Sequence, residues 1–275
     1  MPPLHALAIF AAGLAAGTVN VIVGSGSLIT FPTLIALGYP AVLANVSNNM
    51  GLIPGAASGV HGYRRELAGQ RPRLVRLGVA SLAGGTTGAI LLLNLPAGVF
   101  KDVVPALIGV ALVLVVTGPR LSRRLAAQRA ARAGAGPVAD ADAGPVADTD
   151  GGPVGAASPL PGPVLLFLVG LAGVYGGYFG AAQGIILVAL LSIFLVDELQ
   201  RLNAAKNVLA FLVNGVAGVV FLIDTHINWT IAAIIAVAST IGGQLGAHYG
   251  RKLDPRALRG LIVVVGTAAI VRLLV

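Results

Sequence analysis

Long apolar stretches alternate with short polar or charged segments along almost the whole chain. The apolar stretches lie at 4–23, 27–38, 41–61, 74–94 and 98–117, and then at 163–180, 184–196, 206–224, 229–249 and 258–274. Most have about 20 residues, the length that an α-helix needs to cross the roughly 30 Å hydrocarbon core of a bilayer. The pattern therefore predicts an all-α polytopic integral membrane protein.

Two of the stretches, 27–38 and 184–196, are too short for a straight helix to cross the bilayer. Each follows a longer stretch after an interruption that contains glycine. Broken helices occur in membranes where their non-helical backbone is buried in protein or lines a cavity. We therefore expect 27–38 and 184–196 to be half-helices or single arms of helical hairpins.

The composition supports the membrane class and narrows the function. Of the 275 residues, 56% are hydrophobic and only 10% are charged, whereas about 25% are charged in a typical soluble domain. The chain has no cysteine, which excludes disulfides, thiolate metal sites and a cysteine nucleophile. It also lacks the nucleotide-binding G-x-x-x-x-G-K-[ST] pattern and the hydrolase patterns H-E-x-x-H and G-x-S-x-G. The sequence therefore predicts neither an enzyme nor a bound cofactor or metal.

The two ends of the chain resemble each other. At a constant offset of 158 positions, Gly84–Ala89 matches Gly242–Ala247, Asn45–Asn49 matches Asn203–Asn207, and Gly26 matches Gly184. Collinear matches at one offset indicate duplication more strongly than any single match in a chain rich in glycine and alanine. We therefore divide the chain into a first transmembrane repeat at 1–117 and a second at 163–275, with five apolar segments each.

The segment between the repeats, 118–162, has a different composition. It begins with five arginines between Arg120 and Arg132 and continues with the unit A-G-P-V-A-D at 135–140 and again at 143–148. Such an Ala/Gly/Pro/Asp tract has little to bury, so we expect a disordered linker. The arginines fit either a short amphipathic helix on the anionic cytoplasmic leaflet or, as the favoured interpretation, a simple topology signal.

The net charge of +8 is distributed in short runs between apolar segments, which is typical of the positive-inside rule and not of nucleic-acid binding. If all ten segments cross, the clusters at 64–76, 120–132, 201–206 and 251–259 share the cytoplasmic side. Both termini then lie outside and the repeats are inverted. If the two short segments do not cross, the repeats are parallel and two of the clusters face outside. We favour inverted repeats in a multi-pass protein of the cell membrane.

The interruptions are the best candidates for a binding site. Gly24, Ser25, Gly26 and Ser27 separate the first two segments, and Gln183 with Gly184 occupies the matching place in the second repeat. Free N–H groups at the start of the following helices can hold an anion. Paired glycine-rich breaks in two repeats are typical of the midplane sites of secondary transporters.

Polar side chains recur just after these breaks. Asn48 and Asn49 lie early in the third segment, and Lys206 and Asn207 lie at the matching place in the second repeat. Asparagine is costly in hydrocarbon unless it is paired. Lys206 has two interpretations: it extends to the cytoplasmic interface from the edge of its segment, or it points inward as the counter-charge of an anionic substrate.

These residues carry a family resemblance. The run G-x2-N-x3-G-S-G-S-L-I-T-F-P-T-L from Gly17 to Leu34, followed by A-N-V-S-N-N from Ala44 to Asn49, resembles the TauE/SafE family of membrane transporters, also called YfcA-like. That family usually has G-G-G-G-L-I-T-x-P-x-L and then A-x-x-T-N-K. This chain has Ser25 and Ser27 in place of glycines and ends the second motif without the lysine, whereas Lys206 is present in the second repeat.

The resemblance implies a secondary transporter of a small anion, such as a sulfur oxyanion or an organic sulfonate or carboxylate, working by alternating access. Its partners would be that anion, the lipid bilayer and, as an open alternative, further copies of the chain. The other functions left open are an uncoupled facilitator or channel for a small polar solute and a non-transport accessory subunit. The predicted substrate-binding residues are Gly24, Ser25, Gly26, Ser27, Asn48, Asn49, Gln183, Gly184, Lys206 and Asn207.

Overall fold

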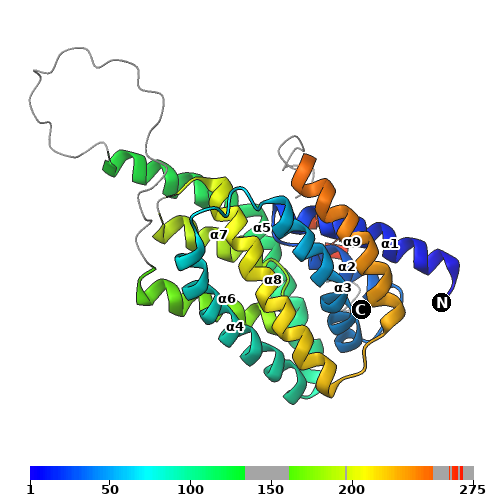
Figure 1. Ribbon diagram of the computed structural model, residues 1–275. Helices are drawn as coiled ribbons and strands as arrows, with labels where there is room; N and C mark the ends of the chain where they lie inside the picture. The colour runs from blue at the N-terminus through cyan, green and yellow to red at the C-terminus, as the bar shows by residue number, and fades with distance from the viewer. Residues whose placement is uncertain (134–160, 196, 250–259, 261, 266, 269–275) are drawn as a thin grey trace, which may run out of the picture.

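The computed structural model describes residues 1–133, 161–195, 197–249, 260, 262–265 and 267–268. Across these residues the chain forms helices and no strands, as the apolar pattern predicts (Figure 1). The helices are α1 (Pro3–Ile22), α2 (Ser27–Ala36), α3 (Ala41–Gly62), α4 (Arg71–Asn94), α5 (Ala97–Ala133), α6 (Pro163–Tyr178), α7 (Gln183–Phe194), α8 (Leu199–Asp224) and α9 (Trp229–Tyr249).

Among the residues that the structure describes, five helical segments are long and apolar enough to cross a membrane: Pro3–Ile22, Arg71–Asn94, Gly98–Thr117, Leu199–Ile223 and Trp229–Tyr249. The short helices α2 and α7 have 10 and 12 residues, so at 1.5 Å per residue neither is long enough to cross. This agrees with the half-helices expected from the sequence. α8 begins at Leu199 instead of at 206 as the hydropathy predicted, because the polar side chains of its first turns are paired inside the protein.

Left-handed residues produce the two helix breaks. After α1 the chain turns at Gly24, whose φ is +85°, and after α6 it turns at Gly180, whose φ is +75°. Ala182 also has a positive φ of 63°, just before α7. Glycine adopts this conformation at little cost, and it commonly ends helices for that reason. In Figure 1, α1 approaches from the right and α6 from the left, so the two breaks face each other near the centre.

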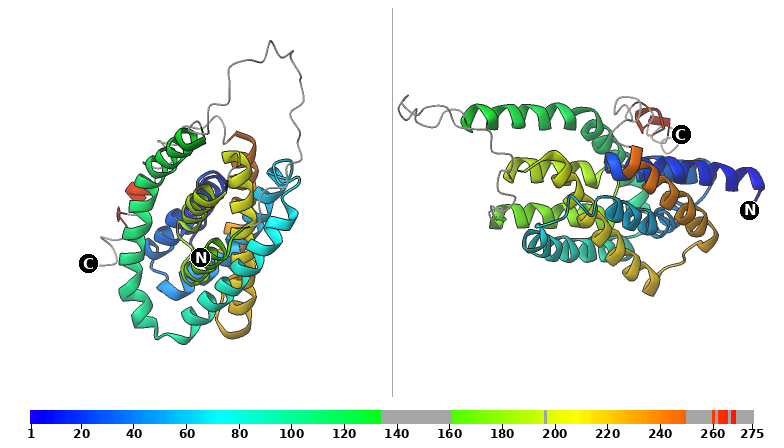
Figure 2. Two further views of the ribbon diagram at one scale, coloured as in Figure 1. Left: turned by 90° about the vertical axis from the view of Figure 1, so that its left-hand side faces the viewer. Right: turned by 45° about the horizontal axis from the view of Figure 1, so that its top comes forward.

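One helix from each half of the chain packs among the helices of the other half. α9 packs along both α1 and α3, whereas α4 packs along both α6 and α8. Each group thus combines helices from both predicted repeats, and α3 and α8 join the groups by packing together. α5 lies along one side of the molecule, where it contacts α7 and α3 (Figure 2).

Close glycine contacts hold these groups together. A Cβ built on Gly84 of α4 would lie 2.0 Å from the carbonyl oxygen of Gly170 on α6. The matching contact joins α9 to α1, because a Cβ on Gly242 would lie 2.1 Å from the carbonyl oxygen of Leu14. Small residues at spacings of four allow membrane helices to approach this closely.

Three aromatic rings, from α2, α5 and the turn after α6, pack together beside the helix breaks. Phe31 of α2 meets Phe179, in the turn after α6, edge to face with ring centroids 5.3 Å apart. Phe100 of α5 lies 6.5 Å from Phe31 and 6.2 Å from Phe179. Edge-to-face pairs of buried rings contribute about 0.5–1.5 kcal/mol beyond their buried area. The cluster therefore positions α2, α5 and the second break relative to one another.

The arginine-rich segment requires a correction. α5 continues past Thr117 to Ala133, so helix occupies 118–133, which the sequence analysis assigned to the linker. Alanine, leucine, arginine and glutamine dominate this stretch, and all favour helix. The repeated A-G-P-V-A-D unit and the cationic cluster at 251–259 lie outside the described residues. Of the predicted segment 258–274, residues 260, 262–265 and 267–268 are described, and they are helical.

Candidate functional site

The two helix breaks contact each other directly. The backbone N–H of Gly184 donates a hydrogen bond to the carbonyl oxygen of Gly24, at 3.1 Å. A Cβ built on either glycine would lie 2.5 Å from the Cα of the other, so neither position has room for a side chain. The structure thus brings two of the predicted site residues together from opposite ends of the chain.

Lys206 is enclosed at this contact. Its side chain is fully buried, and its Nζ donates hydrogen bonds to the carbonyl oxygens of Asn20 and Val21, both at 3.1 Å. These carbonyls belong to the last turn of α1, where intrahelical partners run out. Its Cδ lies close to Gly24 and Gly184. The interpretation in which Lys206 extends to the interface is wrong, because α8 begins before it and directs it inward.

Asparagines bind the ends of the broken helices across the two repeats. Asn203 and Asn207 donate from Nδ2 to the Val21 carbonyl, at 3.3 and 3.4 Å. At the matching place, Asn45 donates from Nδ2 to the carbonyl oxygen of Tyr178, at 3.1 Å. The sequence alignment pairs Asn45 with Asn203, but the predicted site omits both. Each predicted repeat therefore supplies an asparagine that caps the broken helix of the other.

Asn48 occupies the position that matches Lys206, but its partners differ. It donates from Nδ2 to the Oγ of Ser27 at 3.2 Å, and its Oδ1 accepts a hydrogen bond from the hydroxyl of Thr30. Both partners lie on α2, in the same repeat. Thr30 is also absent from the predicted site, because a threonine inside an apolar segment gives no distinct sequence signal.

A small polar cavity lies beside Asn48. Its volume is about 10 Å³, and its lining residues are Ser27, Asn45, Asn48, Asn49, Gly176, Gly177, Phe179, Gly180, Asn214 and Phe221. Asn49 donates from Nδ2 to the carbonyl oxygen of Asn214 at 3.0 Å, which ties α3 to α8 at its edge. A cavity of this size accommodates about one water molecule. The conformation is therefore closed to a tetrahedral oxyanion at this point.

Two further predicted residues flank the glycine contact with polar atoms that lack protein partners. The Oγ of Ser25 and the Nε2 of Gln183 are buried, and neither has a hydrogen-bond partner among the described residues. Gln183 packs its amide against Gly176, where a Cβ would lie 2.3 Å from the Gln183 Cδ. Gly26 packs elsewhere, because a Cβ there would meet the carbonyl oxygen of Ala16 at 2.4 Å. Gly26 therefore supports the turn and packs on α1.

Comparison with known proteins identifies the family. The family model described as sulfite exporter TauE/SafE matches residues 9–273. The chain belongs to the TauE/SafE family. It is 25% identical over 272 residues to a probable membrane transporter protein, ORF9, of Sinorhizobium sp, covering 98% of this chain and 93% of the relative. It is 24% identical to a probable membrane transporter protein of Haemophilus influenzae, with coverages of 93% and 89%.

A third relative is the probable membrane transporter protein YfcA of Escherichia coli K12, 21% identical over 99% of this chain and 90% of the relative. No solved structure matches the chain. The matches run through both predicted repeats, and the helices are apolar, so this TauE/SafE protein is a multi-pass membrane transporter. The polar cluster at its broken helices is accordingly its candidate substrate site.

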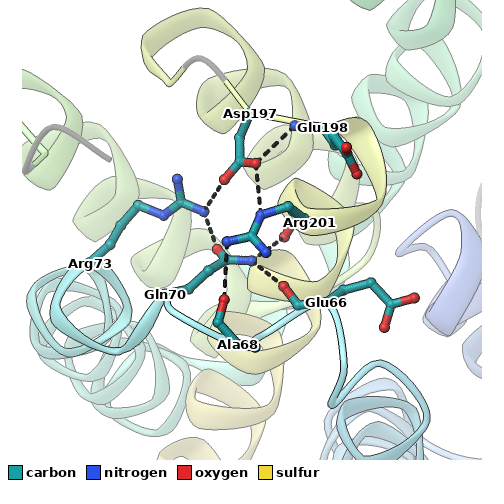
Figure 3. Close-up of polar contacts among 7 residues, drawn as sticks. All are labelled: Glu66, Ala68, Gln70, Arg73, Asp197, Glu198 and Arg201. Carbon is teal, nitrogen blue, oxygen red and sulfur yellow. Dashed lines mark hydrogen bonds and ion pairs between the residues drawn. The ribbon is translucent and has the colours of Figure 1, made fainter. Parts of the chain in front are cut away.

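This TauE/SafE chain also has a buried ion-pair cluster (Figure 3). Asp197, between α7 and α8, accepts hydrogen bonds from Nη2 of Arg73 at 2.7 Å and from Nε of Arg201 at 2.8 Å. Arg73 donates to Gln70 as well, and Nε2 of Gln70 donates to the Arg201 carbonyl at 3.1 Å. Arg201 also donates to the carbonyl of Ala68 at 3.1 Å. The cluster thus ties the α3–α4 loop to the start of α8.

The sequence analysis treated Arg73 and Arg201 only as topology charges. Arg73 is 2% exposed, and its partner Asp197 is distant in the sequence, so no local pattern could reveal the pair. Burial acts to raise the pKa of the Asp197 carboxyl, but the hydrogen bond from Arg73, the backbone N–H of Glu198 and the charges of both arginines outweigh it. The net pKa of Asp197 is therefore lower than usual, and the pair remains charged at neutral pH.

Proposed function

We propose that this TauE/SafE membrane transporter carries a small anion, a sulfur oxyanion or an organic sulfonate or carboxylate, across the cell membrane by alternating access. The observation that carries the proposal is Lys206, a fully buried lysine between two broken helices. In the described part of the chain, no carboxylate forms an ion pair with it. A buried cation without a protein counter-ion is the feature that an anionic substrate would complement.

The surroundings of Lys206 add to the same preference. α2 begins at Ser27 and α7 at Gln183, and both helix N-termini start at the breaks, where the macrodipole places partial positive charge. Asn207 and Asn48 offer amide donors, and Ser25 and Gln183 hold polar atoms without protein partners. A site of this character stabilises negative charge and disfavours cations.

Alternating access requires two structural units that move relative to each other around the site. The reciprocal caps, Asn45 on Tyr178 and Asn203 on Val21, support two homologous repeats. The short α2 and α7, which are too short to cross, would by themselves favour parallel repeats, but the approach of α1 and α6 from opposite ends supports inversion (Figure 1). The cavity of about 10 Å³ then corresponds to a closed conformation that must open to admit substrate.

The test is transport by the purified protein in proteoliposomes. We would measure uptake of sulfite, sulfate, thiosulfate, methanesulfonate and acetate down their gradients, beside the neutral solute glycerol. We expect at least one anion to cross faster than in protein-free vesicles and to show saturation and trans-stimulation, which distinguish a carrier from a channel. Flux of glycerol alone would favour the facilitator, and no flux of any solute would favour an accessory subunit.

A further inference from the structure

The hydrogen bonds of the Lys206 amine bear on how transport is coupled to an energy source. Resting on the proposed function above, we propose that Lys206 is the proton-binding site of the transporter, which takes up one proton with each anion and releases both together on the other side. The inference starts from the hydrogen bonds of the amine, from the ionisable groups around it and from its position between the breaks.

The hydrogen-bond geometry matches a neutral amine. Nζ donates to two carbonyl oxygens, those of Asn20 and Val21, and a neutral amine has two N–H groups to donate. An ammonium has three, and the described residues provide no acceptor for the third. The closed conformation therefore satisfies both N–H groups of the unprotonated lysine and leaves the protonated form one acceptor short.

No neighbouring group compensates a positive charge at this point. On α8 and the segments packed against it, the other described ionisable side chains that are buried or half-buried are Tyr63 and Glu66 of the α3–α4 loop, Arg73 of α4, Tyr175 and Tyr178 of α6, and Asp197 and Arg201 at the start of α8. α7 has no ionisable side chain. Of the two carboxylates among these, Asp197 is bound by both arginines, and neither forms an ion pair with Lys206. A permanently charged Lys206 would thus be an unpaired buried cation, which proteins avoid.

An anion in the site changes this balance. Its oxygens supply the missing acceptor and the missing negative charge, so anion binding favours the protonated lysine. By reciprocity, protonation of the lysine strengthens anion binding by the same factor. The empty carrier then returns with the neutral amine. The cycle is balanced as lysine amine plus proton plus anion giving the ammonium–anion pair, which is electroneutral for a monoanion and carries one net negative charge for a dianion.

The test uses proteoliposomes with a pH indicator inside. Methanesulfonate, sulfate and thiosulfate are suitable substrates, because they bind no proton near neutral pH and any proton movement must come from the protein. With the outside more acidic than the inside, we expect methanesulfonate to accumulate against its gradient, up to about tenfold per unit of pH difference for one proton per anion. Its entry should acidify the lumen without net current, whereas the dianions should produce a current.

Lys206→Arg separates the charge from the proton, because a guanidinium remains charged at any accessible pH. The variant should still exchange anions across the membrane, because it returns with an anion bound, but lose both accumulation driven by pH and lumen acidification. Arg76→Gln is the matched control: it removes a cation from an exposed position of α4 and should keep the coupling of the parent.

The outcomes are distinguishable. Anion transport by the parent that ignores the pH gradient and moves no proton would overturn proton coupling and leave the proposed anion transport intact. The same holds if Lys206→Arg is well folded and retains the full coupling of the parent. No anion flux under any gradient would overturn the proposed function itself. If Lys206→Arg fails to fold, the number of protons that enter with each anion in the parent still decides the question.

Discussion

The two broken helices have similar shapes but different polar partners. In the second repeat, Lys206 reaches across the molecule to carbonyls at the end of α1. In the first repeat, Asn48 occupies the matching place but binds Ser27 and Thr30 on α2, next to it in the same repeat. One break is thus held by a lysine from the other predicted repeat, and the other by neutral side chains of its own predicted repeat. The two predicted repeats therefore differ in the residues that surround their breaks.

The interactions at the starts of α3 and α8 also differ. The start of α8 is held by the buried Asp197 cluster, whereas α3 is connected near its start by neutral hydrogen bonds, from the Asn45 Nδ2 to the Tyr178 carbonyl at 3.1 Å and from the Asn228 N–H to the Ser47 Oγ at 3.0 Å. Opening on the side of the Asp197 cluster therefore has to separate ion pairs. Opening on the other side has weaker interactions to break, as far as the described residues show.

The largest effect should come from filling the contact between the breaks. Gly184→Leu places a side chain where its Cβ would lie 2.5 Å from the Cα of Gly24, and we expect anion flux to fall to the level of protein-free vesicles. Gly38→Ala is the control, since Gly38 has nothing within 4 Å of its Cβ position, although its own φ of 87° is positive. Gly38→Ala should cost about 1 kcal/mol of stability and keep flux. Equal effects of the two on flux would show that the loss does not come from the contact between the breaks.

Replacing the lysine should have the next largest effect. Losing a charge-assisted hydrogen bond costs about 1.5–3 kcal/mol, so Lys206→Ala should raise the apparent Kd for the transported anion about 10- to 150-fold. Thermal-shift titration of the purified protein measures this, with Arg76→Ala as a control for charge. Binding equal to that of the parent would remove Lys206 from the site.

The double variant Asn48→Lys, Lys206→Asn sharpens the comparison of the repeats. It moves the lysine to the matching place in the first predicted repeat. There the neighbouring hydrogen-bond partners are Ser27 and Thr30 instead of the carbonyls at the end of α1. We expect affinity to stay at the level of Lys206→Asn alone. Recovery of the parent's affinity would mean that a lysine on either side of the breaks is sufficient for anion binding. The difference between the two breaks would then not matter for function.

Much of the helical layout was predictable from sequence, and the reasons differ by element. Hydropathy located the breaks at Gly24 and Gly184, because short apolar segments and glycines are local signals. It missed the true start of α8, because Arg201 and Gln200 suggest a loop unless their partners in the α3–α4 loop are known. It also missed the roles of Asn45 and Arg73, since both depend on contacts between segments more than 100 residues apart.

The ion-pair cluster gives a smaller effect that depends on pH. Because the pKa of Asp197 is lowered in the folded protein, its stabilisation is present above the ordinary Asp pKa of about 3.9 and is lost as pH falls through the lower folded value. Asp197→Asn should therefore lower stability by about 1–3 kcal/mol at neutral pH, leaving Arg73 buried without its partner. Thermal unfolding at neutral pH and at acid pH measures this. A variant whose deficit is as large in acid as at neutral pH would contradict the assignment to charge.

The smallest effect tests the reciprocal caps and again contrasts the two repeats. Asn45 is the side-chain donor that the described residues provide to the Tyr178 carbonyl, whereas the Val21 carbonyl accepts from Asn203, Asn207 and Lys206. Asn45→Ala should therefore strand a buried carbonyl and cost about 1–3 kcal/mol, while Asn203→Ala should cost about 0.5–1 kcal/mol, because two donors remain. Thermal unfolding of the two variants in the same detergent gives the difference directly. If Asn203→Ala is the more damaging of the two, the Val21 carbonyl depends on Asn203 more than on Lys206, and the lysine is freer to turn toward a bound anion than its contacts in the closed conformation indicate.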